Sequence, residues 1–145
     1  WCDSTSQWKH VLYRFKPFWS IEFVVKKILI IEDNVILAEN FERILRKNFE
    51  ISHANSAEKA ILKINKRLPD LILLDILLEG HSAFALLNEL QSYADTARIP
   101  VVVCSDLADE LEMESLKHFN VRDIFEKSQL QPRELRERIS EIINE

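Results

Sequence analysis

Polar side chains follow four apolar runs of this sequence, each at the point where the run ends. They are three carboxylates, a hydroxyl and an ammonium group: Glu32, Asp33, Asp75, Ser105 and Lys127. Three carboxylates close together repel one another, and a hard divalent cation such as Mg²⁺ would neutralise them through oxygen ligands. An aspartate beside Mg²⁺ can attack a phosphoryl donor and become an acyl phosphate.

Asp75 is the candidate phosphoryl acceptor, because it ends a fully apolar run at residues 71–74. Lys127 would neutralise phosphate oxygens as a point charge, and Ser105 would donate a hydrogen bond to them. Each residue alone has an ordinary structural explanation, as a helix cap, a complement to a helix dipole or a solvated strand end. Their joint occurrence at the ends of four predicted strands favours a functional site.

Apolar runs and helical periodicities alternate along residues 24–145 and predict five strands and five helices. The expected strands cover residues 26–31, 49–53, 70–75, 99–104 and 122–126. The expected helices cover about residues 34–47, 57–68, 83–97, 106–119 and 132 onward. This alternation predicts an α/β fold, flavodoxin-like and doubly wound, whose five-stranded parallel sheet has the strand order 2-1-3-4-5. The carboxyl ends of strands one, three, four and five then converge at one edge, where the polar residues would share a pocket.

Local signals predict several features of the helices. Asn34 is expected to cap the first helix, and Asn55 with Glu58 resembles a capping box for the second. A single helix is expected over residues 83–97. The helix over residues 106–119 has an incomplete apolar stripe, so we expect it to be weakly anchored.

The composition of the 145 residues excludes several classes of function. Gly80 is the only glycine, so neither a glycine-rich dinucleotide loop nor a P-loop is present. The net charge of −5 gives no electrostatic support for binding nucleic acid or an anionic membrane. No apolar run reaches the roughly 18 residues of a membrane span, and no signal peptide pattern is present. Cys2 and Cys104 predict no disulfide framework and fit a cytoplasmic protein.

Residues 1–23 differ from the rest of the chain, because 7 of the 13 aromatic residues lie there without a regular period. The segment could be translated upstream of a true start near Val24, could be the tail of a preceding domain, or could pack on the domain as an added element. The first interpretation is favoured, because the domain pattern starts cleanly at Val24. We therefore expect a domain over residues 24–145 and a loosely packed extension before it.

Four segments together resemble the receiver domain of bacterial response regulators, and the resemblance covers about residues 24–145. They are residues 28–34 (ILIIEDN), 70–76 (DLILLDI), 99–105 (IPVVVCS) and 123–127 (DIFEK). They resemble, in order, the family's first strand with its acidic pair, its phosphoacceptor strand, its hydroxyl-bearing strand and its last strand with a lysine. Each motif alone is common, but the four in this order are specific.

The resemblance implies that Asp75 accepts a phosphoryl group from a partner histidine kinase or phosphotransfer protein. It implies that Glu32, Asp33 and Asp75 bind Mg²⁺ together with the backbone carbonyl of Leu77. The implied phosphate contacts are Ser105 and Lys127. Such a domain is not an enzyme but a phosphoryl acceptor with at most slow self-dephosphorylation. It would signal by contact with a downstream protein, as a monomer or as a phosphorylation-dependent dimer.

The sequence departs from the family pattern at three positions near the site. Ile124 stands where the family has a switch aromatic, and Asp106 stands where it usually has alanine. Ser128 replaces the proline that usually follows the lysine. A non-proline cis peptide costs about 3–4 kcal/mol, so we expect a trans bond between Lys127 and Ser128.

Three alternatives to a single receiver domain remain open. The chain could be a receiver fragment of a larger response regulator or hybrid kinase. It could be a phosphohydrolase with an aspartyl nucleophile, although haloacid-dehalogenase-like phosphatases carry a general-acid aspartate where this chain has Leu77. It could be a flavodoxin-like electron carrier, although no phosphate loop rich in glycine or hydroxyl groups follows the first strand.

Overall fold

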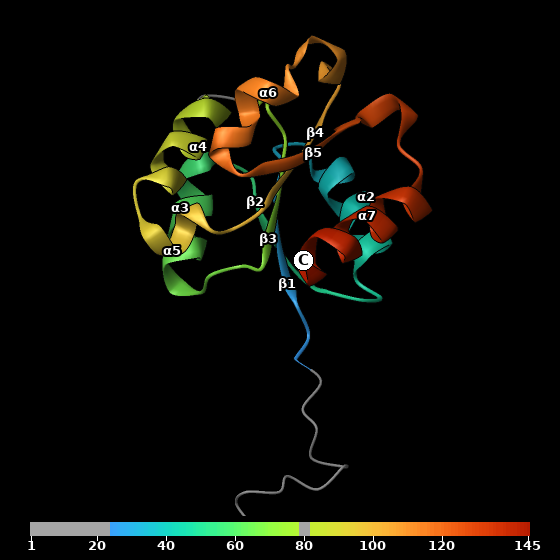
Figure 1. The fold of residues 1–145 in the computed structure, drawn as a ribbon. Coiled ribbons are helices and arrows are strands. Elements are labelled where there is room, and N and C mark those ends of the chain that lie inside the picture. The colour runs from blue at the N-terminus through green and yellow to red at the C-terminus, as the bar shows by residue number, and fades with distance from the viewer. Residues whose placement is uncertain (1–23, 79–81) are drawn as a thin grey trace, which may run out of the picture.

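The computed structural model describes residues 24–78 and 82–145, which contain a five-stranded parallel sheet with helices on both faces (Figure 1). The strands are β1 (Lys27–Ile31), β2 (Glu50–Ala54), β3 (Leu71–Leu74), β4 (Val101–Ser105) and β5 (Val121–Glu126). Their order is β2-β1-β3-β4-β5, and all neighbouring pairs are parallel. The predicted fold class and strand order are therefore confirmed. The prediction for residues 1–23 lies outside the described residues.

The helices of the described residues follow the strands in alternation. The α-helices are α2 (Val35–Leu45), α3 (Ala57–Lys66), α4 (Ala83–Gln91), α5 (Ala94–Ala97), α6 (Met113–Leu116) and α7 (Pro132–Asn144). The 3₁₀ turns are η2 (Ala108–Glu110), η3 (Lys117–Phe119) and η4 (Lys127–Gln129). None of the helices within these described parts of the chain has the length and apolar character needed to cross a membrane.

The sheet separates two apolar cores. Helices α3, α4, α5 and α6 lie on one side of it, and α2 and α7 lie on the other (Figure 1). Alternate strand residues point into opposite cores: Leu29 and Ile31 of β1 join the first core, and Ile28 and Ile30 join the second. Strands covered on both faces have no polar side to expose, which is why they read as unbroken apolar runs in the sequence.

The first two helix starts are set by side-chain caps. Asn34 accepts a hydrogen bond from the backbone N–H of Leu37 at 3.2 Å, as predicted. The cap of α3 is Ser56, whose hydroxyl accepts from the N–H of Lys59 at 3.2 Å. The prediction of Asn55 as this cap was therefore wrong by one residue, because serine and asparagine are both good caps and the spacing alone did not separate them.

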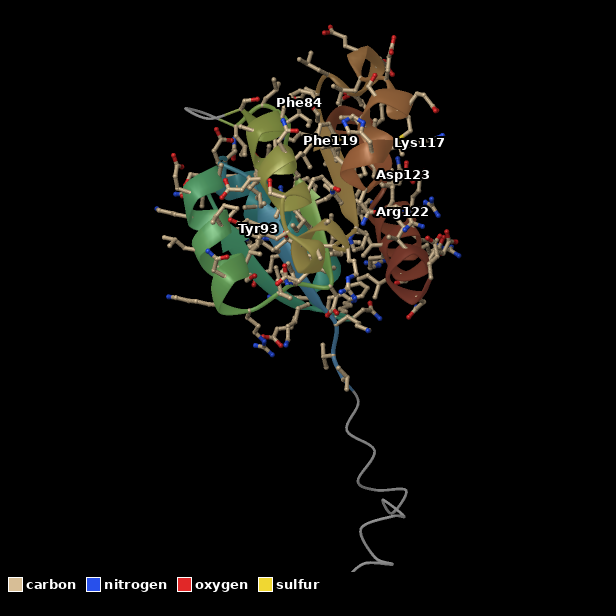
Figure 2. The ribbon with its side chains drawn as sticks, turned by 60° about the vertical axis from the view of Figure 1, so that its left-hand side comes forward. Phe84, Tyr93, Lys117, Phe119, Arg122 and Asp123 are labelled. Carbon is tan, nitrogen blue, oxygen red and sulfur yellow. The ribbon has the colours of Figure 1, made fainter. Side chains whose placement is uncertain are left out.

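The single helix expected over residues 83–97 is interrupted, and that prediction was wrong. Helix α4 ends at Gln91, and the short helix α5 starts after the exposed Tyr93 (Figure 2). The buried Thr96 hydroxyl donates to the carbonyl of Leu90 at 2.6 Å. In a continuous helix that carbonyl would accept from a backbone N–H four residues on, so the threonine side chain replaces a helical hydrogen bond.

The helix expected over residues 106–119 was also a wrong prediction, because this segment contains only η2, α6 and η3. Of these three elements only Leu116 and Phe119 are buried, whereas Lys117 is exposed (Figure 2). Asn120 then ends the segment in the left-handed region, with φ of 60°. Two buried side chains anchor a long helix poorly, which is consistent with the incomplete stripe in the sequence.

The connection from β5 to α7 agrees with the sequence in two respects. No peptide bond in residues 24–78 and 82–145 is cis, so the predicted trans bond between Lys127 and Ser128 is confirmed. Pro132 lies in the first turn of α7, where its missing N–H has no helical partner to lose.

Truncation of Leu73 tests the two-core arrangement. Leu73 is 1% exposed in the centre of β3, and Leu73→Ala is expected to lower the free energy of unfolding by about 2–5 kcal/mol through lost burial and a cavity. The matched control is Leu62→Ala, because Leu62 is 61% exposed and its loss should change stability by less than about 0.5 kcal/mol. Urea denaturation measures both, and equal effects would contradict the assignment of the core.

Candidate functional site

The first half of the site is built by adjacent strand ends. Ile31 of β1 pairs with Leu74 of β3, so Glu32 and Asp75, the next residues, leave the sheet side by side. Backbone hydrogen bonds hold both positions, since Asp75 N–H donates to the Ile31 carbonyl at 3.0 Å. Glu32 N–H donates to the carbonyl of Ala54 in β2 at 3.1 Å. The parallel register therefore brings these two carboxylates together.

Lys127 completes this arrangement from the end of β5. Its Nζ lies 2.8 Å from Oε2 of Glu32 and 3.0 Å from Oδ2 of Asp75. The Lys127 side chain is 9% exposed, and those of Glu32 and Asp75 are 2% and 4% exposed. Removing charges from water costs several kcal/mol for each ion unless opposite charges compensate. The two ion pairs supply that compensation, so the three charged groups depend on one another.

Asp33 adds a third carboxylate to this pair. One oxygen from each of Glu32, Asp33 and Asp75 lies within 4.8 Å of the others. Asp33 is half-buried, and the other two are buried. The donor set is entirely oxygen, which suits Mg²⁺, a cation that binds few carboxylates and keeps several waters. The acidic cluster is therefore consistent with the Mg²⁺ site that the sequence predicts.

One oxygen of this cluster has room for a further partner besides Lys127. Oε2 of Glu32 is buried and faces Lys127, but it makes no hydrogen bond of regular geometry within the described residues. Oε1 of the same side chain accepts from the N–H of Asn34 at 3.2 Å. A buried oxygen with spare acceptor capacity next to two further carboxylates fits a cation ligand.

The pKa values of Glu32 and Lys127 are both raised, but for different physical reasons. Burial raises the pKa of the Glu32 carboxyl; contact with Lys127 opposes this shift and the charge of Asp75 reinforces it. Burial lowers the pKa of the Lys127 ammonium, but its contacts with Glu32 and Asp75 outweigh burial and the pKa is raised above its ordinary value. Lys127 is therefore charged at neutral pH and stays available to hold an anion.

Ser105 is the last residue of β4 and Leu77 lies in the loop after β3, both at the same edge of the sheet as this cluster. Ser105 is fully buried at the end of β4, and its Oγ accepts from the N–H of Leu107 at 3.2 Å. Because that bond uses a lone pair, the hydroxyl proton can be donated elsewhere. The N–H of Leu77 donates to Oδ1 of Asp75 at 3.0 Å. The roles of the Ser105 hydroxyl and of the Leu77 carbonyl stay predictions.

The sequence reasoning missed Glu126. This residue pairs with Ser105 across β4 and β5 and directly precedes Lys127. Its carboxylate accepts hydrogen bonds from the backbone N–H of Ala108 and from the hydroxyl of Ser128, both at 3.2 Å. The only sequence signal was a charged residue at the end of an otherwise half-apolar strand, and that signal is also typical of solvated residues.

The fold and the site define an α/β domain of the flavodoxin-like, CheY-like type with an acidic cluster at the carboxyl edge of its sheet. A family model described as the response regulator receiver domain matches residues 28–140. The chain therefore belongs to the response regulator receiver domain family of two-component signalling, and the predicted resemblance is confirmed.

Individual relatives agree with this assignment. The phosphate regulon transcriptional regulatory protein PhoB of Rhizobium meliloti is 30% identical over 93 residues, which are 61% of this chain and 40% of that protein. The crystal structure of a sensor protein from Polaromonas sp. JS666 is similar with a TM-score of 0.75 and 25% identity, over 82% of this chain and 96% of that one.

A third relative supports the fold alone. A CheY-like response regulator receiver domain from Methylobacillus flagellatus is similar with a TM-score of 0.71 and 23% identity, over 81% of this chain and 98% of that one.

The chain spans less than half the length of the PhoB protein from Rhizobium meliloti, of which 40% is covered. It matches almost the full length of the two solved structures.

Cys104, one residue before Ser105, provides a chemical probe of how tightly this edge is packed. Cys104 is 1% exposed, and burial raises the pKa of its thiol to about 12. The charge of Lys127 opposes this shift but does not overcome it. The thiolate is the reactive form of cysteine, so the thiol should be inert in the folded protein.

We therefore expect iodoacetamide at pH 8 to modify Cys104 about 10³-fold more slowly in the native protein than in urea, since its pKa rises from 9.0 to about 12. The experiment uses Cys2→Ser, because Cys2 is the other cysteine of the sequence. Mass spectrometry of the chain follows the modification. Rapid labelling without denaturant would show that β4 is not packed as described.

Proposed function

We propose that the chain is the phosphoacceptor receiver domain of a two-component or phosphorelay system, with Asp75 as the residue that is phosphorylated. The observation that carries this proposal is the Lys127 ammonium held between Asp75 and Glu32 inside the acidic cluster. The proposed domain is residues 24–145, with residues 1–23 outside it. The phosphoryl donor would be the phosphohistidine of a kinase or of a phosphotransfer protein.

The transfer needs a nucleophile and little other chemistry. An oxygen of the ionised Asp75 carboxylate forms the new O–P bond while the P–N bond of the donor breaks, and the electron pair of that bond stays on the imidazole. The N–H of Leu77 holds Oδ1 of Asp75 at 3.0 Å, which fixes the orientation of the nucleophile. Orientation of this kind lowers the barrier by removing the search for a reactive geometry.

A bound Mg²⁺ would neutralise charge on the transferring phosphoryl oxygens. The residues proposed to hold it are Glu32, Asp33 and Asp75, together with the backbone carbonyl of Leu77. The support for this role is that the three carboxylates offer an all-oxygen donor set and that two of them, Glu32 and Asp75, are buried.

Lys127 and Ser105 are proposed to hold the phosphoryl group after transfer. The Lys127 ammonium is already 3.0 Å from Asp75, so a phosphoryl group on that residue would carry its oxygens into contact range. Ser105 lies at the end of the neighbouring strand β4 and has a hydroxyl proton to donate. Charge-assisted contacts of this kind stabilise the acyl phosphate without acid–base catalysis.

The proposed domain acts as a phosphoryl acceptor rather than as an enzyme with its own turnover. Its output would be contact with a downstream protein target, by a monomer or by a dimer that forms on phosphorylation. It would act in the cytoplasm, where kinase and nucleotide are present. The name of the PhoB relative describes a transcriptional regulator of the phosphate regulon, and control of transcription by a longer protein that contains this domain would be one such output.

Acetyl phosphate with Mg²⁺ tests this proposal without knowledge of the kinase. The chain is expected to gain the mass of one phosphoryl group, and Asp75→Asn is expected to gain none because an amide cannot form the acyl phosphate. Lys127→Ala should slow the gain by about 10- to 100-fold, since it removes one charged contact to the phosphoryl oxygens. Intact-mass spectrometry with a time course measures all three.

The matched control is Asp109→Asn, which makes the same chemical change on an exposed side chain of η2. It should be phosphorylated at the rate of the unaltered chain. Chelation of Mg²⁺ should prevent the mass gain. The proposal fails if the unaltered chain gains no phosphoryl group, or if Asp75→Asn gains one.

A further inference from the structure

Glu126 occupies an unusual place for a charged residue. It is the last residue of β5, it pairs with Ser105 across the sheet, and it directly precedes Lys127. The two residues before it point into the two apolar cores, Ile124 into the first and Phe125 into the second. The strand alternation directs Glu126 toward the same side as Ile124, the side that carries η2 and α6.

Both oxygens of this carboxylate are bonded to protein groups. Oε2 accepts from the backbone N–H of Ala108 at 3.2 Å, at the start of η2 in the loop after β4. Oε1 accepts from the hydroxyl of Ser128 at 3.2 Å, in the loop after β5. Glu126 is half-buried. One side chain thus connects the two loops that follow the last two strands.

Both connections directly follow a residue proposed to contact the phosphate, Ser105 at the end of β4 and Lys127 after β5. Ala108 is three residues after Ser105, and Leu107, which directly precedes Ala108, donates its N–H to the Ser105 hydroxyl at 3.2 Å. Ser128 directly follows Lys127. The Glu126 carboxylate therefore holds the chain just after Ser105 and just after Lys127, whereas the strands of the sheet hold the chain just before these two residues.

We propose that Glu126 is a positioning residue: it ties the loop of Ser105 to the loop of Lys127 and so sets the spacing of the two groups that bind the phosphoryl oxygens. This inference rests on the proposed function of Asp75. It also gives a reason for Ser128, because a serine at this position provides the hydroxyl that reaches Glu126, which a residue without a donor could not do.

Loss of the Glu126 contacts should change the affinity for beryllofluoride but not the affinity for Mg²⁺, whereas a general disturbance of the site would lower both. Beryllofluoride, a phosphoryl analogue, needs the Ser105 and Lys127 loops in addition to Mg²⁺. Mg²⁺ alone needs the acidic cluster, which Glu126 does not contact in any described hydrogen bond or ion pair. Glu126→Ala should therefore weaken beryllofluoride binding by about five- to tenfold and leave Mg²⁺ affinity within twofold, the first figure being typical of lost hydrogen bonds.

Two conservative changes sharpen the test. Glu126→Gln keeps an oxygen for the Ala108 N–H and an amide that can donate to the Ser128 hydroxyl, so it should restore beryllofluoride affinity to within twofold. Ser128→Ala removes only the second contact and should weaken binding less than Glu126→Ala. Asp109→Ala, a charge removal on the same edge, should have no effect.

Calorimetry gives the Mg²⁺ affinity, ¹⁹F NMR gives the bound beryllofluoride, and circular dichroism confirms that each variant is folded. Equal beryllofluoride affinity in Glu126→Ala and the unaltered chain would overturn the inference, as would a proportional loss of Mg²⁺ affinity. Ser128→Ala keeps the test valid if Glu126→Ala does not fold. Failure of the unaltered chain to bind beryllofluoride at Asp75 would instead reject the proposed function.

Discussion

The contacts of Lys127 with Glu32 and Asp75 are the interaction on which the site depends. Two nearly buried carboxylates beside a third would repel one another, and the ammonium between them at 2.8 and 3.0 Å makes their burial tolerable. The cluster brings oxygens of three carboxylates together, a donor set of the kind that Mg²⁺ prefers. The same ammonium is then already in place for a group with phosphate oxygens.

The sheet is the constraint that makes these contacts possible. Parallel strands run in the same direction, so their carboxyl ends lie at one edge of the sheet. The register pairs the last residue of β1 with the last residue of β3, and the last residue of β4 with the last residue of β5. Residues far apart in the chain therefore meet without a binding loop of their own. Gly80 is the only glycine of the sequence, and under the proposed function the strand ends and one lysine would supply the phosphate contacts in place of a glycine-rich loop. Glu126 adds a contact between two of the loops that leave the same edge, because its carboxylate binds both Ala108 and Ser128.

The sequence was most informative where one physical effect dominates. Strands buried on both faces must be apolar throughout, so the strands, their order and the edge with Asp75 could all be predicted. Prediction failed where a single side chain competes with the backbone, as when the Thr96 hydroxyl takes the Leu90 carbonyl and ends α4. It also failed for Glu126, because its contacts with Ala108 and Ser128 depend on strand register and loop geometry that no local pattern contains.

A crystal structure with bound Mg²⁺ and beryllofluoride would show whether Asp75 is the phosphoryl acceptor and whether the acidic cluster holds the metal. We expect beryllium bonded to a carboxylate oxygen of Asp75, Mg²⁺ among Glu32, Asp33 and Asp75, and fluorine contacts from Lys127 and Ser105. Mg²⁺ bound at another place, or a beryllofluoride group on any residue other than Asp75, would contradict it.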